Sequence, residues 1–338
     1  MINAVISYPH DSPPQAGFAY SVHPGIRWLR MPLPFALDHI NLWLLEDGAA
    51  WTAVDTGFSA TPVKEAWQQV LADRQLERVL VTHFHPDHLG LAAWLEEQYG
   101  AGLWMTQSEF LAAQVVHAQI GGWSVPAMLD FFVQHGLVGD PVEGLRARGN
   151  VYARGVPVIP HTFRRIQDGD SIAVGDHHWQ VIVGSGHSPE HACLHCADLG
   201  VLISGDMVLP RISTNIAVFA GTPDANPLAW FLASLDRLRA LPADTLVLPS
   251  HGLPFRGLHA RIAQLEAHHA ARCDDLLDAC LAPKTAAEII PVLFARPLND
   301  PHQVMFAMGE AIAHLNYLHQ ARRLERVADH GIIRFART

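Results

Sequence analysis

The chain has few charged residues, few cysteines and no long apolar run. Charged residues make up 17% of its 338 positions and hydrophobic residues 49%, a balance that excludes an intrinsically disordered chain. Lys and Arg number 23 against 33 Asp and Glu, and the resulting net charge of −10 would repel nucleic acid. Four cysteines are too few for a disulfide framework in a chain of this length, which favours a reducing cytoplasm.

No segment has the features of a membrane span or a secretory signal. The sequence contains no run of 18 or more apolar residues, and residues 1–14 lack the basic start and the apolar stretch of a signal peptide. We therefore expect a cytoplasmic globular protein without membrane association. Cys193 and Cys196 form a C-x-x-C pair in a strand-like segment, and we interpret them as core thiols because no second pair completes a zinc site.

Turn residues and hydrophobic periodicity divide the chain into three parts. Residues 1–20 are rich in Pro, Ser and Gly and form an N-terminal arm. Residues 21–256 alternate short β-rich runs with helical patterns, which predicts a layered α/β domain. A long helical insert at residues 107–155 interrupts this domain, either as a lid over a binding site or as a packing helix pair.

Residues 257–338 are helical up to a short terminal hairpin. Thr285 and Glu288 match the capping box of a helix that begins at Ala286, and a further helix is predicted from Pro301 to Arg322. In residues 323–335, polar and apolar residues then alternate on both sides of an Asp-His-Gly turn, which predicts a hairpin. Two helices followed by a β-hairpin predict a winged-helix domain.

The segment THFHPDHLG at residues 82–90 concentrates potential metal ligands. Four of them lie within six positions at the end of a predicted strand: His83, His85, Asp87 and His88. Imidazole nitrogens and carboxylate oxygens suit zinc or iron, and core packing gives no reason for such a group. Three further candidates follow other predicted strands at Gly-rich turns: His187, Asp206 and His251. Their repeated position at strand ends predicts a common site.

The sequence resembles the metallo-β-lactamase-fold superfamily, whose core is an αββα sandwich. The resemblance lies in the motif H-x-H-x-D-H followed, in this order, by a strand-end His, an Asp and a final His. The resemblance covers residues 20–255 and includes a glyoxalase II-like metal-binding motif. The predicted winged helix is similar to the one that follows this core in one branch of the superfamily. VDTG at residues 54–57 also matches, which implies that Asp55 lies behind the metal ligands and orients them.

The resemblance implies two ligand sets and a bridge. His83, His85 and His187 would hold one metal, Asp87, His88 and His251 the other, and Asp206 would join them. We expect two divalent ions, zinc in the first place, with iron or manganese as alternatives. Two cations about 3.5–4 Å apart can lower the pKa of a shared water to ~7, so that a metal-bound hydroxide is the expected nucleophile.

Asp87 is the candidate catalytic residue, because its carboxylate can accept a hydrogen bond from that hydroxide and aim it. The acid that protonates the leaving group stays open between Asp87 and a metal-bound water. Six apolar residues of three loops either wall a pocket for an acyl substrate or pack in the core: Met31, Phe35, Trp123, Phe131, Ile216 and Phe219.

These features predict a dinuclear metal-dependent hydrolase acting on a small ester, thioester or lactone, with a homodimer left open. One alternative is a metal-dependent endoribonuclease or phosphodiesterase, which the winged helix and the Arg322, Arg323 and Arg326 run favour. Residues 284–338 nevertheless carry only seven basic against five acidic residues, a weak charge for binding phosphates. A persulfide-dioxygenase-like iron enzyme would leave part of the ligand set unused. A non-enzymatic transcription factor would give the set no role.

Overall fold

The computed structural model describes residues 5–294, 298 and 300–338 of the chain. They form two compact units, each assembled from separate stretches of sequence. The first contains the described residues up to His117 together with Tyr152–Thr214 and Leu235–Ile262; the second contains Ala118–Val151, Asn215–Ser234 and the described part of Ala263–Thr338. Across the described residues, no helix is both long enough and apolar enough to span a membrane.

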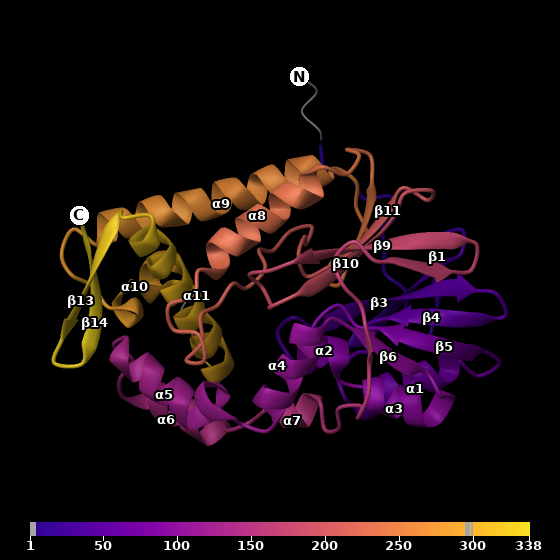
Figure 1. Ribbon diagram of the computed structural model, residues 1–338, viewed down its shortest axis with the longest axis horizontal. Coiled ribbons are helices and arrows are strands. Elements are labelled where there is room, and N and C mark those ends of the chain that lie inside the picture. The colour runs from indigo at the N-terminus through magenta and orange to yellow at the C-terminus, as the bar shows by residue number, and fades with distance from the viewer. Residues whose placement is uncertain (1–4, 295–297, 299) are drawn as a thin grey trace. The chain divides into compact units, whose positions relative to one another are not determined.

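A seven-stranded sheet is the first layer of the first unit (Figure 1). Strands that follow one another in sequence are neighbours in it, in the order β1 to β7. β1 to β4 pair antiparallel across short turns, whereas β4 to β7 pair parallel across connections that contain helices. The strands are β1 (Tyr20–His23), β2 (Ile26–Pro32), β3 (His39–Asp47), β4 (Ala50–Val54), β5 (Gln75–Leu80), β6 (Gly102–Met105) and β7 (Arg164–Arg165).

A five-stranded sheet in the order β12-β11-β10-β9-β8 is the second layer. The Ala192 amide donates to the Thr82 carbonyl just past β5 at 2.9 Å, which links the two sheets at one edge. Cys193 and Cys196 are buried free thiols of β10, which confirms their interpretation as core residues. The strands are β8 (Ser171–Val174), β9 (His177–Gly184), β10 (His191–Cys196), β11 (Val201–Gly205) and β12 (Leu246–Pro249).

The apolar core fills two layers because neighbouring strand residues point to opposite faces. The stacked rings of Trp28 and Trp43 pack in a cluster that contains residues of both sheets. Leu29 and Leu42 point to the other face, where helices cover the first sheet. Arg237 of α8 (Pro227–Arg239) donates to the Val183 carbonyl of β9 at 2.6 Å. The layering confirms the predicted αββα sandwich. The helices that cover the first sheet are α1 (Thr61–Val70), α3 (Ala92–Tyr99) and α4 (Gln107–His117).

The second unit contains the predicted pair of helices and the hairpin. The hydroxyl of Thr285 accepts from the Glu288 amide at 3.2 Å and the Glu288 carboxylate accepts from the Thr285 amide at 2.8 Å, which confirms the capping box. His330 and Gly331 both have positive φ, 48° and 80°, as a two-residue hairpin turn requires. The elements are α9 (Leu258–Ala279), which begins in the first unit, then α10 (Ala286–Leu293), α11 (Pro301–Gln320), β13 (Leu324–Asp329) and β14 (Ile332–Arg337).

The predicted insert at residues 107–155 contributes to both units. α4 and α7 (Tyr152–Gly155) belong to the first unit, whereas η1 (Gly121–Trp123), α5 (Val125–Gln134) and α6 (Asp140–Arg148) belong to the second. Within the second unit, the Ala287 amide of α10 donates to the His135 carbonyl after α5 at 3.1 Å. These helices therefore pack with the C-terminal elements. A role of the insert as a lid stays a prediction.

Candidate metal centre

Loops at one edge of the two sheets bring the seven predicted ligands together. One loop follows β5 and leads into α2 (Pro86–Leu89); the others follow β9, β11 and β12. Pro86 suits the first turn of α2 because proline needs no amide hydrogen bond there. The early helix start turns Asp87 and His88 back toward His83. The ligand atoms fall into three overlapping groups: His83, His85 and His187; His83, His88 and Asp206; and Asp87, His88 and His251.

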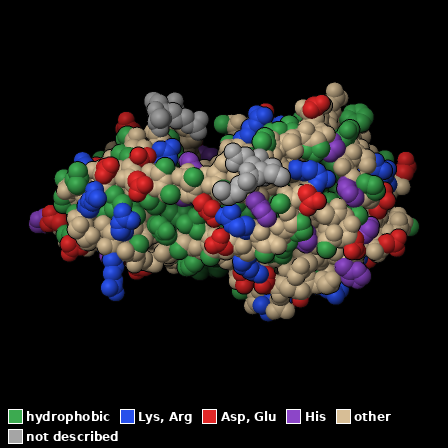
Figure 2. All heavy atoms as spheres, turned by 90° about the horizontal axis from the view of Figure 1, so that it is seen from above, with side chains coloured by type: hydrophobic (Ala, Val, Ile, Leu, Met, Phe, Trp, Pro, Cys, Tyr) green, Lys and Arg blue, Asp and Glu red, His purple; other side chains and the backbone are tan. Residues whose placement is uncertain are grey.

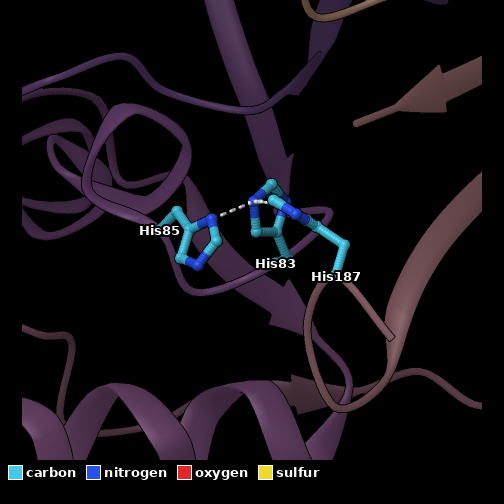
Figure 3. A group of neighbouring side chains, drawn as sticks. All are labelled: His83, His85 and His187. Atoms are coloured by element: carbon cyan, nitrogen blue, oxygen red, sulfur yellow. Dashed lines mark hydrogen bonds between the residues drawn. The ribbon is translucent and has the colours of Figure 1, made fainter. Parts of the chain in front are cut away.

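Three histidines from two loops point at one another (Figure 3). His83 Nε2 lies 2.9 Å from His85 Nδ1 and 3.1 Å from His187 Nε2. Nitrogens around a tetrahedral zinc with bonds of about 2.1 Å lie about 3.4 Å apart, so these three are close to the positions one ion needs. Burial, reinforced by neighbouring imidazoles, lowers the pKa of His83 well below its usual range and that of His85 to about 3. Both rings are therefore neutral, as a metal ligand must be.

A second group of ligand atoms lies beside the first, with Asp206 in contact with both. Asp87 Oδ2 is 3.6 Å from His88 Nε2 and 3.5 Å from His251 Nε2. Asp206 Oδ2 is 3.4 Å from His187 Nε2, and Asp206 Oδ1 is 3.5 Å from His251 Nε2. The carboxylate of Asp206 thus contacts a histidine of each group.

Two of these atoms are buried without a hydrogen-bond partner among the described residues, namely His88 Nε2 and Asp206 Oδ1. A buried polar atom without a partner is costly, so native structures usually supply one. Both atoms can donate a lone pair, and the surrounding nitrogen and oxygen donors are of the kind that zinc and similar divalent ions prefer. The residues of the centre therefore fit divalent metal ions.

The charges around His88 also favour a cation. Burial by itself would raise the pKa of Asp87, but His88 and His251 outweigh it and lower the pKa to about 2. Burial would lower the pKa of His88, but the carboxylates of Asp55, Asp87 and Asp206 raise it well above its usual range. The negative potential that attracts a proton to His88 would equally attract a metal ion to its Nε2 atom.

Asp55 lies directly behind His88. Its carboxylate accepts from His88 Nδ1 at 2.8 Å, from the Thr82 amide at 2.8 Å and from the Thr82 hydroxyl. A carboxylate can only accept, so His88 donates from Nδ1, and Nε2 is the nitrogen that faces the ligand group. The His39 carbonyl fixes His251 in the same way, by accepting from Nδ1 at 2.8 Å.

Sequence reasoning left one further residue of the centre without a role. His191 Nε2 accepts from the Asp206 amide at 3.1 Å, and its ring stacks on His83 with centroids 4.8 Å apart. Gly205 has a positive φ of 53°, and a Cβ at that position would lie 2.3 Å from the His191 ring. The sequence signal was the second histidine in GHSPEH, four positions after His187.

Three of the six apolar residues that could either wall a pocket or pack in the core are buried. Met31 and Ile216 have no exposed surface and Phe131 is buried, so none of the three can contact a substrate at the surface. For these three residues the burial therefore favours core packing over a place in the pocket wall. Phe35 is 41% exposed and packs its ring edgewise on Phe58 at 5.4 Å. In the second unit lie two further candidates for the pocket wall, Trp123 and Phe219, with their ring centroids 6.3 Å apart.

Comparison with known proteins agrees with this geometry. The family model described as Metallo-beta-lactamase superfamily matches residues 36–251, and that described as Metallo-beta-lactamase-like, C-terminal domain matches residues 273–338. The chain is 27% identical to "Probable metallo-hydrolase YqjP" of Bacillus subtilis, over 86% of this chain and 91% of that protein. It is 30% identical to a hydroxyacylglutathione hydrolase of Albidiferax ferrireducens, over 65% of each.

Two solved structures match nearly the whole chain. A β-lactamase domain protein from Burkholderia ambifaria is 48% identical with a TM-score of 0.93, and 98% of each chain is covered. A metallo-β-lactamase family protein from Thermus thermophilus is 31% identical with a TM-score of 0.79, over 94% of this chain and 100% of that one. On the sequence motifs, the sandwich and these matches together, the chain belongs to the metallo-β-lactamase superfamily of hydrolases.

Proposed function

We propose that this protein is a dinuclear metal-dependent hydrolase that cleaves a small ester, thioester or lactone. The observation that carries the proposal is the contact of Asp206 with two ligand groups, in a centre where His88 Nε2 and Asp206 Oδ1 are buried without a partner. The proposed ligands are His83, His85 and His187 for one ion, Asp87, His88 and His251 for the other, and Asp206 as the bridge.

The residues of the centre would divide the work of hydrolysis. Two divalent ions, zinc in the first place, would supply Lewis acidity and lower the pKa of bound water to about 7. Asp87, whose pKa is about 2, is ionised at neutral pH and can accept a hydrogen bond from the attacking water and orient it. Asp55 and the His39 carbonyl keep the lone pairs of His88 and His251 aimed into the centre.

Two observations favour the proposed substrate class. The relatives named hydroxyacylglutathione hydrolase act, by that name, on an acylated thiol, which is chemically a thioester. The exposed Phe35 ring, backed by Phe58, offers apolar surface to an acyl group in the same unit as the centre.

Charge pairing in the second unit argues against the nuclease alternative. Arg326 pairs with Asp224 at 2.5 Å, Arg334 with Glu288 at 3.0 Å and Arg337 with Asp278 at 3.2 Å. Acidic and basic side chains are also interspersed over the face drawn in Figure 2. Phosphate groups would have to compete with carboxylates for these arginines.

The test combines metal analysis with a substrate panel of one ester, one thioester, one lactone and one phosphodiester. The purified protein should contain two divalent ions per chain and hydrolyse at least one of the first three substrates, and a chelator should abolish this turnover. Asp206→Ala should lower the metal content and abolish turnover, because two cations at close range would repel without the bridging charge. Two ions and full activity in that variant would contradict the proposal.

A further inference from the structure

One buried carboxylate outside the ligand set touches both loops that carry the histidine trio. Glu109 of α4 has no exposed surface. Its Oε2 atom accepts from the Phe84 amide at 3.0 Å, and its Oε1 atom accepts from the Ser188 hydroxyl at 2.6 Å and the Glu190 amide at 2.7 Å. Phe84 lies between His83 and His85, and Ser188 directly follows His187.

The groups that Glu109 contacts belong to residues next to, or close to, the histidines of Figure 3 in the sequence. Phe84 lies between His83 and His85 in sequence, so the hydrogen bond to its amide holds the backbone from which both rings extend. The two hydrogen bonds at Oε1 hold the start of the segment after His187. A single rigid side chain thus sets the distance between the two loops from which the three nitrogens converge.

Neighbouring contacts support the same two loops from the same part of the fold. The Tyr152 hydroxyl donates to the Phe84 carbonyl at 2.7 Å. The Glu190 carboxylate accepts from the Ser108 amide at 3.0 Å, and the Glu190 carbonyl accepts from the Thr106 hydroxyl at 2.9 Å. Each of these contacts holds one loop, whereas Glu109 holds both.

We propose that Glu109 is a positioning residue that sets the spacing between the His83–His85 pair and His187, and so sets the affinity of this trio for its metal ion. The inference rests on the ligand assignment of the proposed function. Burying a carboxylate is expensive, and the three hydrogen bonds that offset this cost all come from the two ligand loops. A purely apolar side chain would fill the same space without that cost, which is why we assign the carboxylate to positioning.

The principal variant is Glu109→Gln. Glutamine has the same size and keeps one acceptor oxygen. Its amide nitrogen is a donor, however, and it would face either the Phe84 amide or the donors of Ser188 and Glu190, which are donors themselves. The matched control is Glu310→Gln on α11, because Glu310 is also largely removed from solvent and its acceptor contact is with Asn215 in the second unit. The buried donor–donor contact should lower the unfolding temperature of the metal-free Glu109→Gln protein, so its circular dichroism spectrum is first compared with that of wild type to show that it is folded.

The readouts are stepwise affinities for Zn²⁺, measured by competition with a chromogenic chelator, and the visible absorption spectrum with Co²⁺. We expect Glu109→Gln to lower the affinity for one of the two ions by about 10 to 100-fold, which is the usual effect of changing a residue behind metal ligands. The Co²⁺ absorption bands of that ion should change as well. Glu310→Gln should leave both affinities and the spectrum unchanged.

Unchanged affinities and an unchanged Co²⁺ spectrum in a folded Glu109→Gln protein would overturn the inference. If that variant does not fold, Ser188→Ala removes one of the two hydrogen bonds that Glu109 accepts on the His187 side. It should weaken binding of the same ion several-fold, and no change there would also overturn the inference. A wild-type protein that binds two ions but hydrolyses no panel substrate would refute the proposed function while the affinity comparison still stands. A wild-type protein that binds no metal would refute both.

Discussion

Asp55 shows how much one side chain behind the ligands can contribute to the centre. Asp55→Asn keeps the shape and an acceptor oxygen, but it removes the negative charge beside His88 and turns an amide toward the Thr82 or His88 donors. We expect metal affinity or activity to fall by roughly 10 to 100-fold without loss of folding. Titration of the metal-free protein with Zn²⁺ measures this directly.

The matched control for this change is Asp47→Asn in the same unit. Asp47 also accepts several hydrogen bonds, from the Thr52 hydroxyl, Arg78 and the Gly175 amide, but none of these groups is a proposed ligand. Its variant should bind Zn²⁺ as wild type does. Equal affinities for the Asp55 and Asp47 variants would show that the charge behind His88 has no effect on the metal.

We expect the Glu310 carboxyl to make the stability of the protein depend on pH. Burial raises the pKa of this carboxyl from 4.5 to about 7, against hydrogen bonding from Asn215. The folded state therefore holds the proton more tightly than the unfolded state does, so the contribution of Glu310 to stability is present below about pH 4.5 and is lost as the pH rises through 7. Glu310→Gln should gain stability relative to wild type over that interval, by up to about 3 kcal/mol.

Urea unfolding of both proteins at pH 5, 6, 7 and 8 checks this expectation. Both proteins are unfolded in the metal-free state, with a chelator present, so that metal binding does not enter the comparison. A difference in the free energy of unfolding that stays constant from pH 5 to pH 8 would show that the Glu310 carboxyl does not titrate differently in the folded state.

At the residue scale, the sequence predicts which side chains come together in the centre better than it predicts which residues position them. The seven candidate ligands share a visible pattern, since each follows a strand at a turn. Glu109 and the His39 carbonyl carry no such pattern, because they reach the centre through contacts that join distant parts of the chain. The apolar character of a residue also does not tell whether it lines a pocket or packs in the core. Met31 and Ile216 could have done either, and both are buried.

Element boundaries decide how the centre is formed, and Gly90 marks the most important one. After His85 the chain forms two helices, α2 and α3, with Gly90 between them. A Cβ at Gly90 would lie 2.4 Å from the Pro86 carbonyl oxygen and 2.6 Å from that of Gly57. Backbone atoms cannot move as a flexible side chain can, so only glycine fits there.

Gly90→Ala should therefore shift α2, which carries Asp87 and His88. We expect a loss of about 1–3 kcal/mol in unfolding free energy, the usual cost of overpacking, together with reduced metal content. Gly102→Ala is the control, because a Cβ at Gly102 meets nothing within 4 Å. Urea unfolding and metal analysis of both variants provide the test, and equal stability of the two would contradict the steric argument.

Long periodic elements were predictable, and short ones were not. The capping box at Thr285 and the hairpin around His330 and Gly331 have local signals that tertiary contacts do not override. β5 ends at Leu80, because the Thr82 amide and hydroxyl donate to the Asp55 carboxylate rather than to a neighbouring strand. β1 and β6 have four residues each, too few for a clear alternating pattern.

At the scale of the whole molecule, the grouping of distant segments has no signal in the sequence. Residues 118–151 and 215–234 belong to the same unit as the C-terminal helices. Contacts such as that of Arg148 with His302, or of Asn316 with the Pro223 carbonyl, create this grouping. The predicted boundary near residue 256 rests on composition alone and stays a prediction.

The charge of the whole molecule bears on the choice between a hydrolase of small molecules and a nuclease. A protein that binds RNA through several phosphates loses orders of magnitude in affinity between ~50 and ~200 mM salt. The net charge here is −10, and three arginines of the C-terminal region already pair with Asp224, Glu288 and Asp278. We therefore expect no measurable RNA binding even at low salt.

Fluorescence anisotropy with a labelled RNA hairpin, in steps from ~50 to ~200 mM NaCl, tests this expectation. The positive control is the triple variant Asp224→Asn, Glu288→Gln, Asp278→Asn, which removes three negative charges and releases Arg326, Arg334 and Arg337 from their partners. If pairing is what suppresses phosphate binding, this variant should gain weak, salt-sensitive affinity that wild type lacks. Tight, salt-steep binding by the wild-type protein, with metal-dependent cleavage of the RNA, would instead favour the nuclease and overturn the small-molecule assignment.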